Sequence, residues 1–285
     1  MNSSFIQADD LLNSIDFDYV KIIDCRYNLE DKSKGLRLYK NSHIQKAIFF
    51  DLEEDVSGPT QQNGIGGRHP LPSKEKWEKT LSEHGIRNED HIIIYDSGEL
   101  AYSARCSWLF QFYGHKKVQI LVGGFTSWKE KGFPVTDQME RTKVSTYQAE
   151  PRLEWIVTMD EVKEISNGEK EGILLDSRAE DRYKGIVEPM DRIPGHIKGA
   201  VNVPWMLAVK DGTLDEPDNL KKLFRDIPKN QQIVVYCGSG VTAIPNVYAL
   251  ASIGYNNVRL YPGSYSDWVS DYSNEVEKTK AKVIF

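Results

Sequence analysis

The sequence predicts two α/β domains in tandem, each built on a parallel β-sheet with helices on both faces. Two observations lead to this prediction: several short motifs occur twice in the same order, and short apolar segments alternate with helical patterns in both halves. At 285 residues the chain is also long for one compact domain, whereas two domains of roughly 140 residues each are of ordinary size.

Four pairs of motifs repeat along the chain. They are KIIDCR (21–26) and ILLDSR (173–178), HIQKAIFF (43–50) and HIKGAVNVP (196–204), HIIIYDSG (91–98) and QIVVYCGS (232–239), and GGFTSW (123–128) and PGSYSDW (262–268). Because the order is the same in both halves, they indicate a tandem duplication. The charged segment between the halves contains Pro151 and is typical of a linker. We therefore expect domains at 1–137 and 159–285, joined by a linker at 138–158.

Each half contains short apolar runs bounded by turn residues, the pattern of strands buried on both faces. We expect strands at 22–23, 92–95, 119–122 and 233–236. Helical patterns lie at 73–84, where Pro72 and Ser73 form a cap signal, and at 101–112. Another helix is expected from about 243 to 251, with Pro245 in its first turn, where proline is tolerated. Strands that alternate with helices predict parallel sheets.

Composition narrows the class of partner. The net charge of −6 gives no support for binding to nucleic acid or to a membrane surface, and no stretch approaches the roughly 18 apolar residues of a membrane span. The N-terminus lacks the features of a secretory signal, so we expect a cytoplasmic protein that acts on small molecules. Cys25, Cys106 and Cys237 are too few and too scattered for a disulfide framework or a zinc site, so we expect a thiol and no metal.

The segment VVYCGSGVTA (234–243) is the strongest candidate site. Cys237 follows a predicted strand and precedes a predicted helix, at the sheet edge where α/β proteins bind ligands. Gly238 and Gly240 allow the loop to turn its amides inward and form an anion site, to which Ser239 and Thr242 add hydroxyl groups. Such a field favours the thiolate over the thiol. The alternative is a buried core thiol before an ordinary turn.

Comparison of the two halves favours the reactive thiol. The first half has Asp96 at the position of Cys237, so thiol chemistry is expected only in the second half. Cys25 follows a strand and Cys106 lies within a predicted helix, and we interpret both as packing residues. The residues that occur in both halves are interpreted as scaffold: Asp24, Arg26, His43, Asp176, Arg178 and His196.

These motifs resemble the tandem-rhodanese sulfurtransferases over essentially the whole chain. The resemblance rests on two halves that each carry Asp-x-Arg and His-Ile-x-x-Ala, with a cysteine loop only in the second. It implies two rhodanese-like domains and a persulfide on Cys237 that passes sulfur to cyanide, a thiol or thioredoxin, without a cofactor. The loop is similar to that of the 3-mercaptopyruvate type; it runs Cys237, Gly238, Ser239, Gly240, Val241, Thr242, Ala243.

The uncharged loop suits a donor with one carboxylate and a keto group better than thiosulfate, which has two negative charges. The resemblance implies two arginines for that carboxylate. Arg182 matches the first, and Arg192 matches the second approximately, because Met190 and Asp191 stand where the family has a different pattern. Arg105, on the helix after the inactive loop, is expected to face either the domain interface or the substrate.

The resemblance also implies help from the first half. An acidic residue, Asp51 or Glu53, and His69 are expected to assist proton transfer through Ser239, although a surface-loop histidine is the alternative reading.

Three other functions share features with this sequence. A thiosulfate:cyanide sulfurtransferase and a non-catalytic sulfur carrier stay open. A cysteine phosphatase needs an arginine six residues after its cysteine, where this chain has Ala243, so that activity is not expected.

Overall fold

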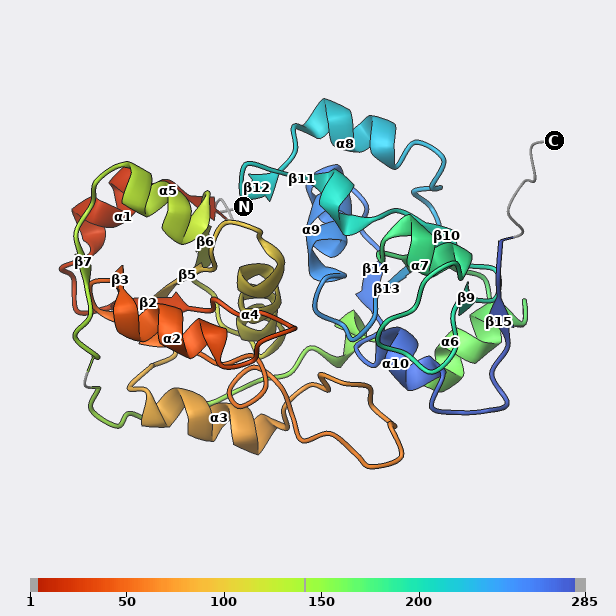
Figure 1. Cartoon of the computed structure of the whole chain (residues 1–285), viewed down its shortest axis with the longest axis horizontal. Helices are drawn as coiled ribbons and strands as arrows, with labels where there is room; N and C mark the ends of the chain where they lie inside the picture. The colour runs from red at the N-terminus through yellow and green to blue at the C-terminus, as the bar shows by residue number, and fades with distance from the viewer. Residues whose placement is uncertain (1–4, 141, 280–285) are drawn as a thin grey trace. The chain divides into compact units, whose positions relative to one another are not determined.

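The computed structural model describes residues 5–140 and 142–279 (Figure 1). By its packing the chain forms two compact units. The first comprises the described residues of Met1–Gly58, Leu71–Leu153 and Asp211–Thr213, and the second comprises those of Pro59–Pro70, Glu154–Lys210 and Leu214–Phe285. Three segments are therefore placed differently from the expected boundaries: much of the expected linker and Asp211–Thr213 belong to the first unit, and Pro59–Pro70 belongs to the second.

The first unit contains a five-stranded sheet in the order β1-β6-β5-β2-β4, with all neighbours parallel. Its strands are β1 (Phe5–Ile6), β2 (Val20–Asp24), β4 (Ala47–Phe49), β5 (His91–Tyr95) and β6 (Val118–Leu121). A small antiparallel pair, β3 (His43–Ile44) and β7 (Val135–Thr136), lies apart from it. The parallel sheet that the alternating pattern predicts is confirmed.

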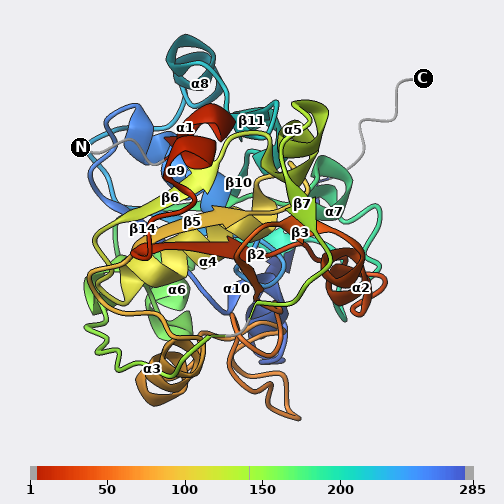
Figure 2. The same ribbon diagram turned by 90° about the vertical axis from the view of Figure 1, so that its left-hand side faces the viewer.

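Helices cover both faces of this sheet. Figure 2 shows α1 (Ala8–Ser14) and α5 (Gly124–Glu130) on one side and α3 (Lys74–Glu83) and α4 (Ala101–Phe112) on the other. Tyr39 of α2 (Lys34–Asn41) packs in the same core cluster as α1 and α5. On the opposite face, Trp77 and Phe110 meet edge to face with 5.0 Å between ring centroids. The cap signal is realised, since the Ser73 side chain accepts the backbone N–H of Lys76.

The expected linker packs along the first unit. Tyr147 and Ala149 are buried, and their backbone N–H groups donate to Ser82 Oγ at 3.1 Å and Glu78 Oε1 at 2.8 Å. Burial of apolar side chains, not visible in a charged stretch of sequence, fixes this segment in place.

The second unit repeats the topology of the first. Its parallel sheet has the order β10-β8-β13-β14, and Ile156 adds a parallel bridge to Leu260, as β1 does beside β6 in the first unit. The strands are β8 (Ile173–Asp176), β10 (Val201–Asn202), β13 (Ile233–Tyr236) and β14 (Val258–Leu260). Separate short strands are β9 (His196–Ile197), β11 (Val209–Lys210), β12 (Thr213–Leu214) and β15 (Val276–Glu277), and short 3₁₀ turns lie at η1 (Leu153–Trp155) and η2 (Trp205–Ala208).

Helices α6 (Met159–Ser166), α7 (Glu180–Lys184) and α10 (Ser264–Trp268) lie on one side of this sheet, while α8 (Pro217–Leu223) and α9 (Ile244–Ser252) lie on the other (Figure 1). Val162, Leu174, Tyr236 and Trp268 belong to one buried cluster, which joins α6 and α10 to the sheet. The second unit therefore has a core of its own. No helix among the described residues has the length and apolar character needed to cross a membrane.

The repeated Asp-x-Arg motif forms the same buried ion pair in both units. Arg26 Nη2 donates to Asp24 Oδ2 at 2.6 Å, and Arg178 Nη2 donates to Asp176 Oδ2 at 2.6 Å. All four side chains are buried. Two internal copies with one geometry identify these residues as scaffold.

The repeated histidines also play matching roles. His43 stacks on Tyr39 and lies 2.6 Å from its carbonyl oxygen through Nδ1, while His196 stacks on Tyr183 with the corresponding distance of 2.7 Å. Each imidazole therefore ties a short strand to the preceding helix, β3 to α2 and β9 to α7, which agrees with a structural role.

Candidate active site

Cys237 lies directly after β13 and is buried. Its backbone N–H donates to Ser264 Oγ at 3.2 Å, and its carbonyl accepts the N–H of Tyr265 at 3.0 Å. The carbonyl of Gly238 accepts the N–H of Ser266 at 2.9 Å. The start of α10 thus holds the first residues of the loop in position.

Two glycines are needed in this loop for different reasons. Gly240 has φ +76°, in the left-handed region, and a Cβ there would collide with the carbonyl oxygen of Pro262. A Cβ at Gly238 would lie 2.8 Å from Arg68 Nη2. The rest of the loop continues through buried Val241 and half-buried Thr242 into α9.

The corresponding loop of the first unit holds an anion. The carboxylate of Asp96 accepts backbone N–H groups from Gly98 at 3.0 Å, Leu100 at 3.3 Å and Ser103 at 3.1 Å, and the Ser103 hydroxyl at 2.7 Å. Asp96 is buried, so these donors replace its water. Asp96 and Cys237 follow the matching strands β5 and β13, so the two side chains start at equivalent positions of the two loops.

His69 and Ser239 lie together in the second unit. His69 Nδ1 is 2.8 Å from Ser239 Oγ, and both residues are buried. The segment that carries His69 is fixed to the same unit, because the N–H of Gly66 donates to Asp267 Oδ1 at 2.7 Å. The histidine therefore reaches the loop although most of the preceding chain belongs to the first unit.

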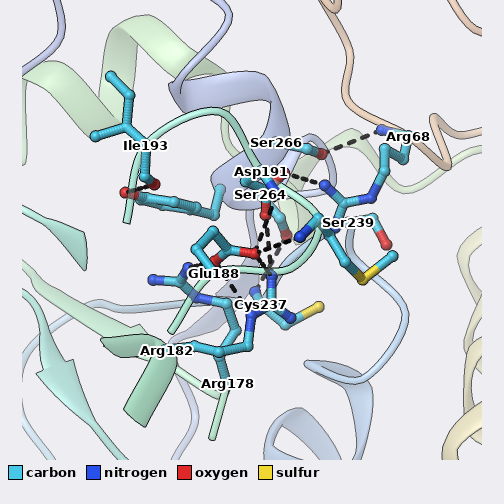
Figure 3. A network of polar contacts seen from close by, with 12 residues as sticks. Arg68, Arg178, Arg182, Glu188, Asp191, Ile193, Cys237, Ser239, Ser264 and Ser266 are labelled. Carbon is cyan, nitrogen blue, oxygen red and sulfur yellow. Dashed lines mark hydrogen bonds and ion pairs between the residues drawn. The ribbon is translucent and has the colours of Figure 1, made fainter. Parts of the chain in front are cut away.

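Arg182 of α7 also faces the loop. Its Nη1 and Nη2 lie 3.5 Å from the point where a Cβ on Gly238 would stand. Its guanidinium donates to Glu188 at 3.1 and 2.7 Å and to Asp191 Oδ2 at 3.0 Å (Figure 3). Burial works to raise the pKa of Glu188, but the hydrogen bond and charge of Arg182 outweigh it and keep that pKa below its usual value.

Arg68 lies beside the loop, although it is not among the residues expected from the sequence. Its Nη2 lies beside Gly238, and its Nη1 donates to Asp191 Oδ1 (Figure 3). The feature of the sequence that could have indicated a nearby cation is Asp191, which stands where the family has a different pattern. An acidic side chain that becomes buried requires a cation, and Arg68 supplies it from a distant segment.

Arg192 lies elsewhere. Its Nε and Nη2 donate to the carbonyl oxygen of Val269 at 3.2 and 2.7 Å, and its guanidinium stacks over the Tyr272 ring at 3.8 Å. Arg192, the approximate match to the family's second arginine, thus contacts the end of α10, while the neighbouring Asp191 accepts from Arg68 and Arg182.

The remaining candidates belong to the first unit. Asp51 Oδ1 accepts the backbone N–H groups of Glu53 and Glu54 at 2.8 and 3.2 Å, and Glu53 accepts the Tyr27 hydroxyl at 3.1 Å. These contacts shape the turn after β4. Arg105 is buried within α4.

The other two cysteines fit their interpretation as packing residues. Cys25 and Cys106 are both buried. Burial, reinforced by the neighbouring Cys106 side chain, raises the pKa of Cys25 well above that of an exposed thiol. Within residues 5–140 and 142–279, no cluster of three or more His, Cys, Asp or Glu side chains is arranged to hold a metal ion.

Comparison with known proteins places both units in one family. A family model described as Rhodanese-like domain matches residues 7–131 and 158–271. The chain is 36% identical to a probable 3-mercaptopyruvate sulfurtransferase of Pseudomonas aeruginosa, over 88% of this chain and 89% of the relative. It is 31% identical to a thiosulfate sulfurtransferase of Mus musculus, over 92% and 89% of the two chains.

A solved structure shows the same fold. The crystal structure of SseA from Escherichia coli, a 3-mercaptopyruvate sulfotransferase by its description, superposes with a TM-score of 0.83 at 32% identity. The match covers 93% of this chain and 99% of the other.

Proposed function

The chain belongs to the rhodanese family and is a sulfurtransferase, and we propose that it moves sulfur from 3-mercaptopyruvate to a thiophilic acceptor through a persulfide on Cys237. The matching loops of the two units support Cys237 as the nucleophile. In the first unit, loop amides hold the Asp96 carboxylate, and Cys237 starts the corresponding loop of the second unit. A thiolate or persulfide anion at this position gains the same kind of donors.

The reaction divides into two displacements. In the first, the Cys237 thiolate attacks the donor sulfur, the S–S bond forms, and the C–S bond of 3-mercaptopyruvate breaks. Its electron pair leaves on carbon as the enolate of pyruvate, which takes up the proton that the Cys237 thiol released. In the second, the acceptor attacks the outer sulfur, the S–S bond breaks, and its electron pair returns to Cys237. Cyanide then leaves as thiocyanate, and a thiol leaves as a persulfide.

His69 and Ser239 are proposed to carry the proton between these groups. Their 2.8 Å contact supports this role, because a hydroxyl bound to an imidazole relays a proton at neutral pH. The roles of Asp51 and Glu53 are supported by the family resemblance alone, and that of Arg105 by its position on the helix after the inactive loop.

Thiosulfate is the second candidate donor. The cationic groups of Arg68 and Arg182 beside Gly238 favour an anion, and some relatives carry the name thiosulfate sulfurtransferase. The carboxylates of Glu188 and Asp191 already pair with these guanidinium groups, which favours a singly charged donor such as 3-mercaptopyruvate.

We further infer a small thiol, cyanide or a thioredoxin-like protein as acceptor and the cytoplasm as location. The support is chemical: Cys237 must be regenerated as a free thiol, and the three cysteines are free in this structure.

The persulfide predicts a measurable adduct. After incubation with 3-mercaptopyruvate, we expect the intact mass of the protein to increase by one sulfur atom, and dithiothreitol to remove the increase. Cys237→Ser should show no adduct, because it lacks the attacking sulfur. Cys106→Ala serves as the matched control, since that thiol is buried in α4, and it should retain the adduct. Wild-type protein without an adduct from either 3-mercaptopyruvate or thiosulfate would contradict the proposal.

A further inference from the structure

The segment that carries Arg68 is held firmly against the second unit. The N–H of Arg68 donates to Ser266 Oγ at 3.1 Å, and Gly67 lies so close to the carbonyl of Gly263 that a Cβ there would collide with it. Gly66 adds its hydrogen bond to Asp267. The backbone of Arg68 is therefore fixed at the start of α10, whose residues also hold Cys237 and Gly238.

Two guanidinium groups converge next to the cysteine. A Cβ on Gly238 would stand 2.8 Å from Arg68 Nη2 and 3.5 Å from Arg182 Nη1 and Nη2, so both groups face the residue that follows Cys237. Asp191 links them, because its Oδ1 accepts Arg68 Nη1 and its Oδ2 accepts Arg182 Nη2. Figure 3 shows this bridge beside the loop.

Arg68 has unused hydrogen-bonding capacity. Its Nε is buried and has no hydrogen-bond partner among the described residues, while the side chain as a whole is 27% exposed. A buried guanidinium N–H without an acceptor costs free energy, and a ligand carboxylate would supply the missing acceptor. The planar fork of arginine suits that geometry.

The positive and negative charges around Arg68 and Arg182 are balanced. The guanidinium groups of Arg68, Arg178 and Arg182 are matched by the carboxylates of Asp176, Glu188 and Asp191, through the contacts Arg68–Asp191, Arg178–Asp176, Arg178–Glu188 and Arg182–Glu188. A second negative charge on a donor would face Asp191 and Glu188 without an added cation, which is unfavourable at low dielectric. A single carboxylate with a neutral keto group meets less repulsion.

We propose that Arg68 and Arg182 together bind the carboxylate of the sulfur donor, and that Asp191 between them is a specificity-determining residue that disfavours a doubly charged donor. Arg68 thus takes the role that the sequence assigned to Arg192, from a segment more than a hundred residues earlier. The inference rests on the proposed function for the identity of the donor.

Kinetics with both donors test the clamp. Arg68→Gln should raise KM for 3-mercaptopyruvate about tenfold to a hundredfold with a much smaller change in kcat, as the loss of a charge-assisted hydrogen bond predicts. The KM of Arg68→Lys should lie between those of the wild type and Arg68→Gln, since lysine keeps the positive charge but lacks the planar guanidinium group. Arg225→Gln, at an exposed arginine, is the matched control. A KM that rises in Arg192→Gln and not in Arg68→Gln would overturn the proposal.

Specificity is tested at Asp191. Asp191→Asn removes one negative charge and keeps the shape, so the ratio of kcat/KM for thiosulfate to kcat/KM for 3-mercaptopyruvate should increase about tenfold or more. An unchanged or lower ratio would overturn the role of Asp191. Circular dichroism and thermal unfolding of each variant establish that it is folded.

A binding measurement separates this inference from the proposed function. Pyruvate carries the same carboxylate and keto group as the donor but has no sulfur to transfer, and we expect it to protect Cys237 from alkylation by iodoacetamide. Arg68→Gln should need about tenfold or more pyruvate for equal protection. Equal protection in wild type and Arg68→Gln would overturn the clamp even if the sulfur adduct forms, whereas a missing adduct with normal protection would overturn only the proposed function.

Discussion

A side chain added at either of two glycines in the active-site loop would affect a different property of the protein. Gly240 has a left-handed backbone and lies against the Pro262 carbonyl, so neither its conformation nor its surroundings accept a Cβ. Gly238 lacks a positive φ, and the nearest atom to its absent Cβ is the end of the flexible Arg68 side chain. The first position controls the fold of the loop, and the second controls the placement of a guanidinium group.

Alanine at the two positions should therefore give opposite results. Gly240→Ala should lower the free energy of unfolding by about 2 kcal/mol or more, because it combines backbone strain with a backbone collision. Gly238→Ala should change it by less than about 1 kcal/mol and should raise KM for the donor by displacing Arg68. Urea unfolding and steady-state kinetics measure the two effects. Equal destabilisation by both variants would contradict this distinction.

The loops that follow β5 and β13 are matching elements with different contents. In the first unit the loop is closed by the Asp96 carboxylate, and the neighbouring Glu99 is brought close to that charge. Burial, with the charge of Asp96 as the next cause, raises the pKa of Glu99 to about 7. In the first unit the loop amides thus bind the Asp96 carboxylate, and the charge of Asp96 makes ionisation of the neighbouring Glu99 less favourable.

This raised pKa predicts a pH dependence of stability. Between about pH 4.5 and 7 the folded state binds more protons at Glu99 than the unfolded state, so the free energy of unfolding should fall as pH rises through this range. Glu99→Gln should remove that loss and be more stable than wild type by up to about 3 kcal/mol at pH 8, with little gain near pH 4. Urea unfolding at both pH values measures it, with Glu130→Gln as an exposed control. A gain that is equal at both pH values would argue against the titration of Glu99.

Across the whole chain, the duplication preserved the scaffold and diversified the site. Both units have the same strand order, the same buried Asp–Arg pair and the same stacked Tyr–His pair. In the second unit the pair is extended, because Arg178 Nη1 also donates to Glu188 at 3.1 Å, and Glu188 holds Arg182. In the second unit, Glu188 therefore links the buried Asp176–Arg178 pair to Arg182 of the proposed donor site.

The repeated pair predicts matched effects on stability and unequal effects on activity. Asp24→Asn and Asp176→Asn should each destabilise the unit that contains them by about 3–5 kcal/mol, because each leaves a buried arginine uncompensated. Hydrogen exchange of peptides from β5 and β13 reports on the two units separately. Only Asp176→Asn should lower sulfur transfer under conditions where both variants are folded. Asp16→Asn, at an exposed carboxylate, is the control. A comparable loss of activity in Asp24→Asn would count against this connection.

Much of the fold was accessible from local patterns. The strand predicted at 233–236 and the helix predicted at 101–112 have the bounds of β13 and α4, because apolar runs and turn residues encode such elements locally. The strand predicted at 22–23 extends to Val20–Asp24, since the polar residues Lys21 and Asp24 also pair with β5. The charge of residues 138–158 predicts a linker, while the packing of this segment depends on a few buried side chains such as Tyr147.

The duplicated α/β fold, the single thiol in a glycine loop and the first arginine all follow from residues close together in the chain, whose spacing is fixed by covalent geometry and secondary structure. The second arginine beside the loop, Arg68, cannot be found from such local features of the sequence. The contact between Arg68 and Asp191 spans 123 residues, and it forms because Pro59–Pro70 folds onto the second unit and buries an acidic side chain that needs a cation. Such a pairing is decided by how distant segments pack, so only the tertiary structure shows that Arg68 lies beside the loop.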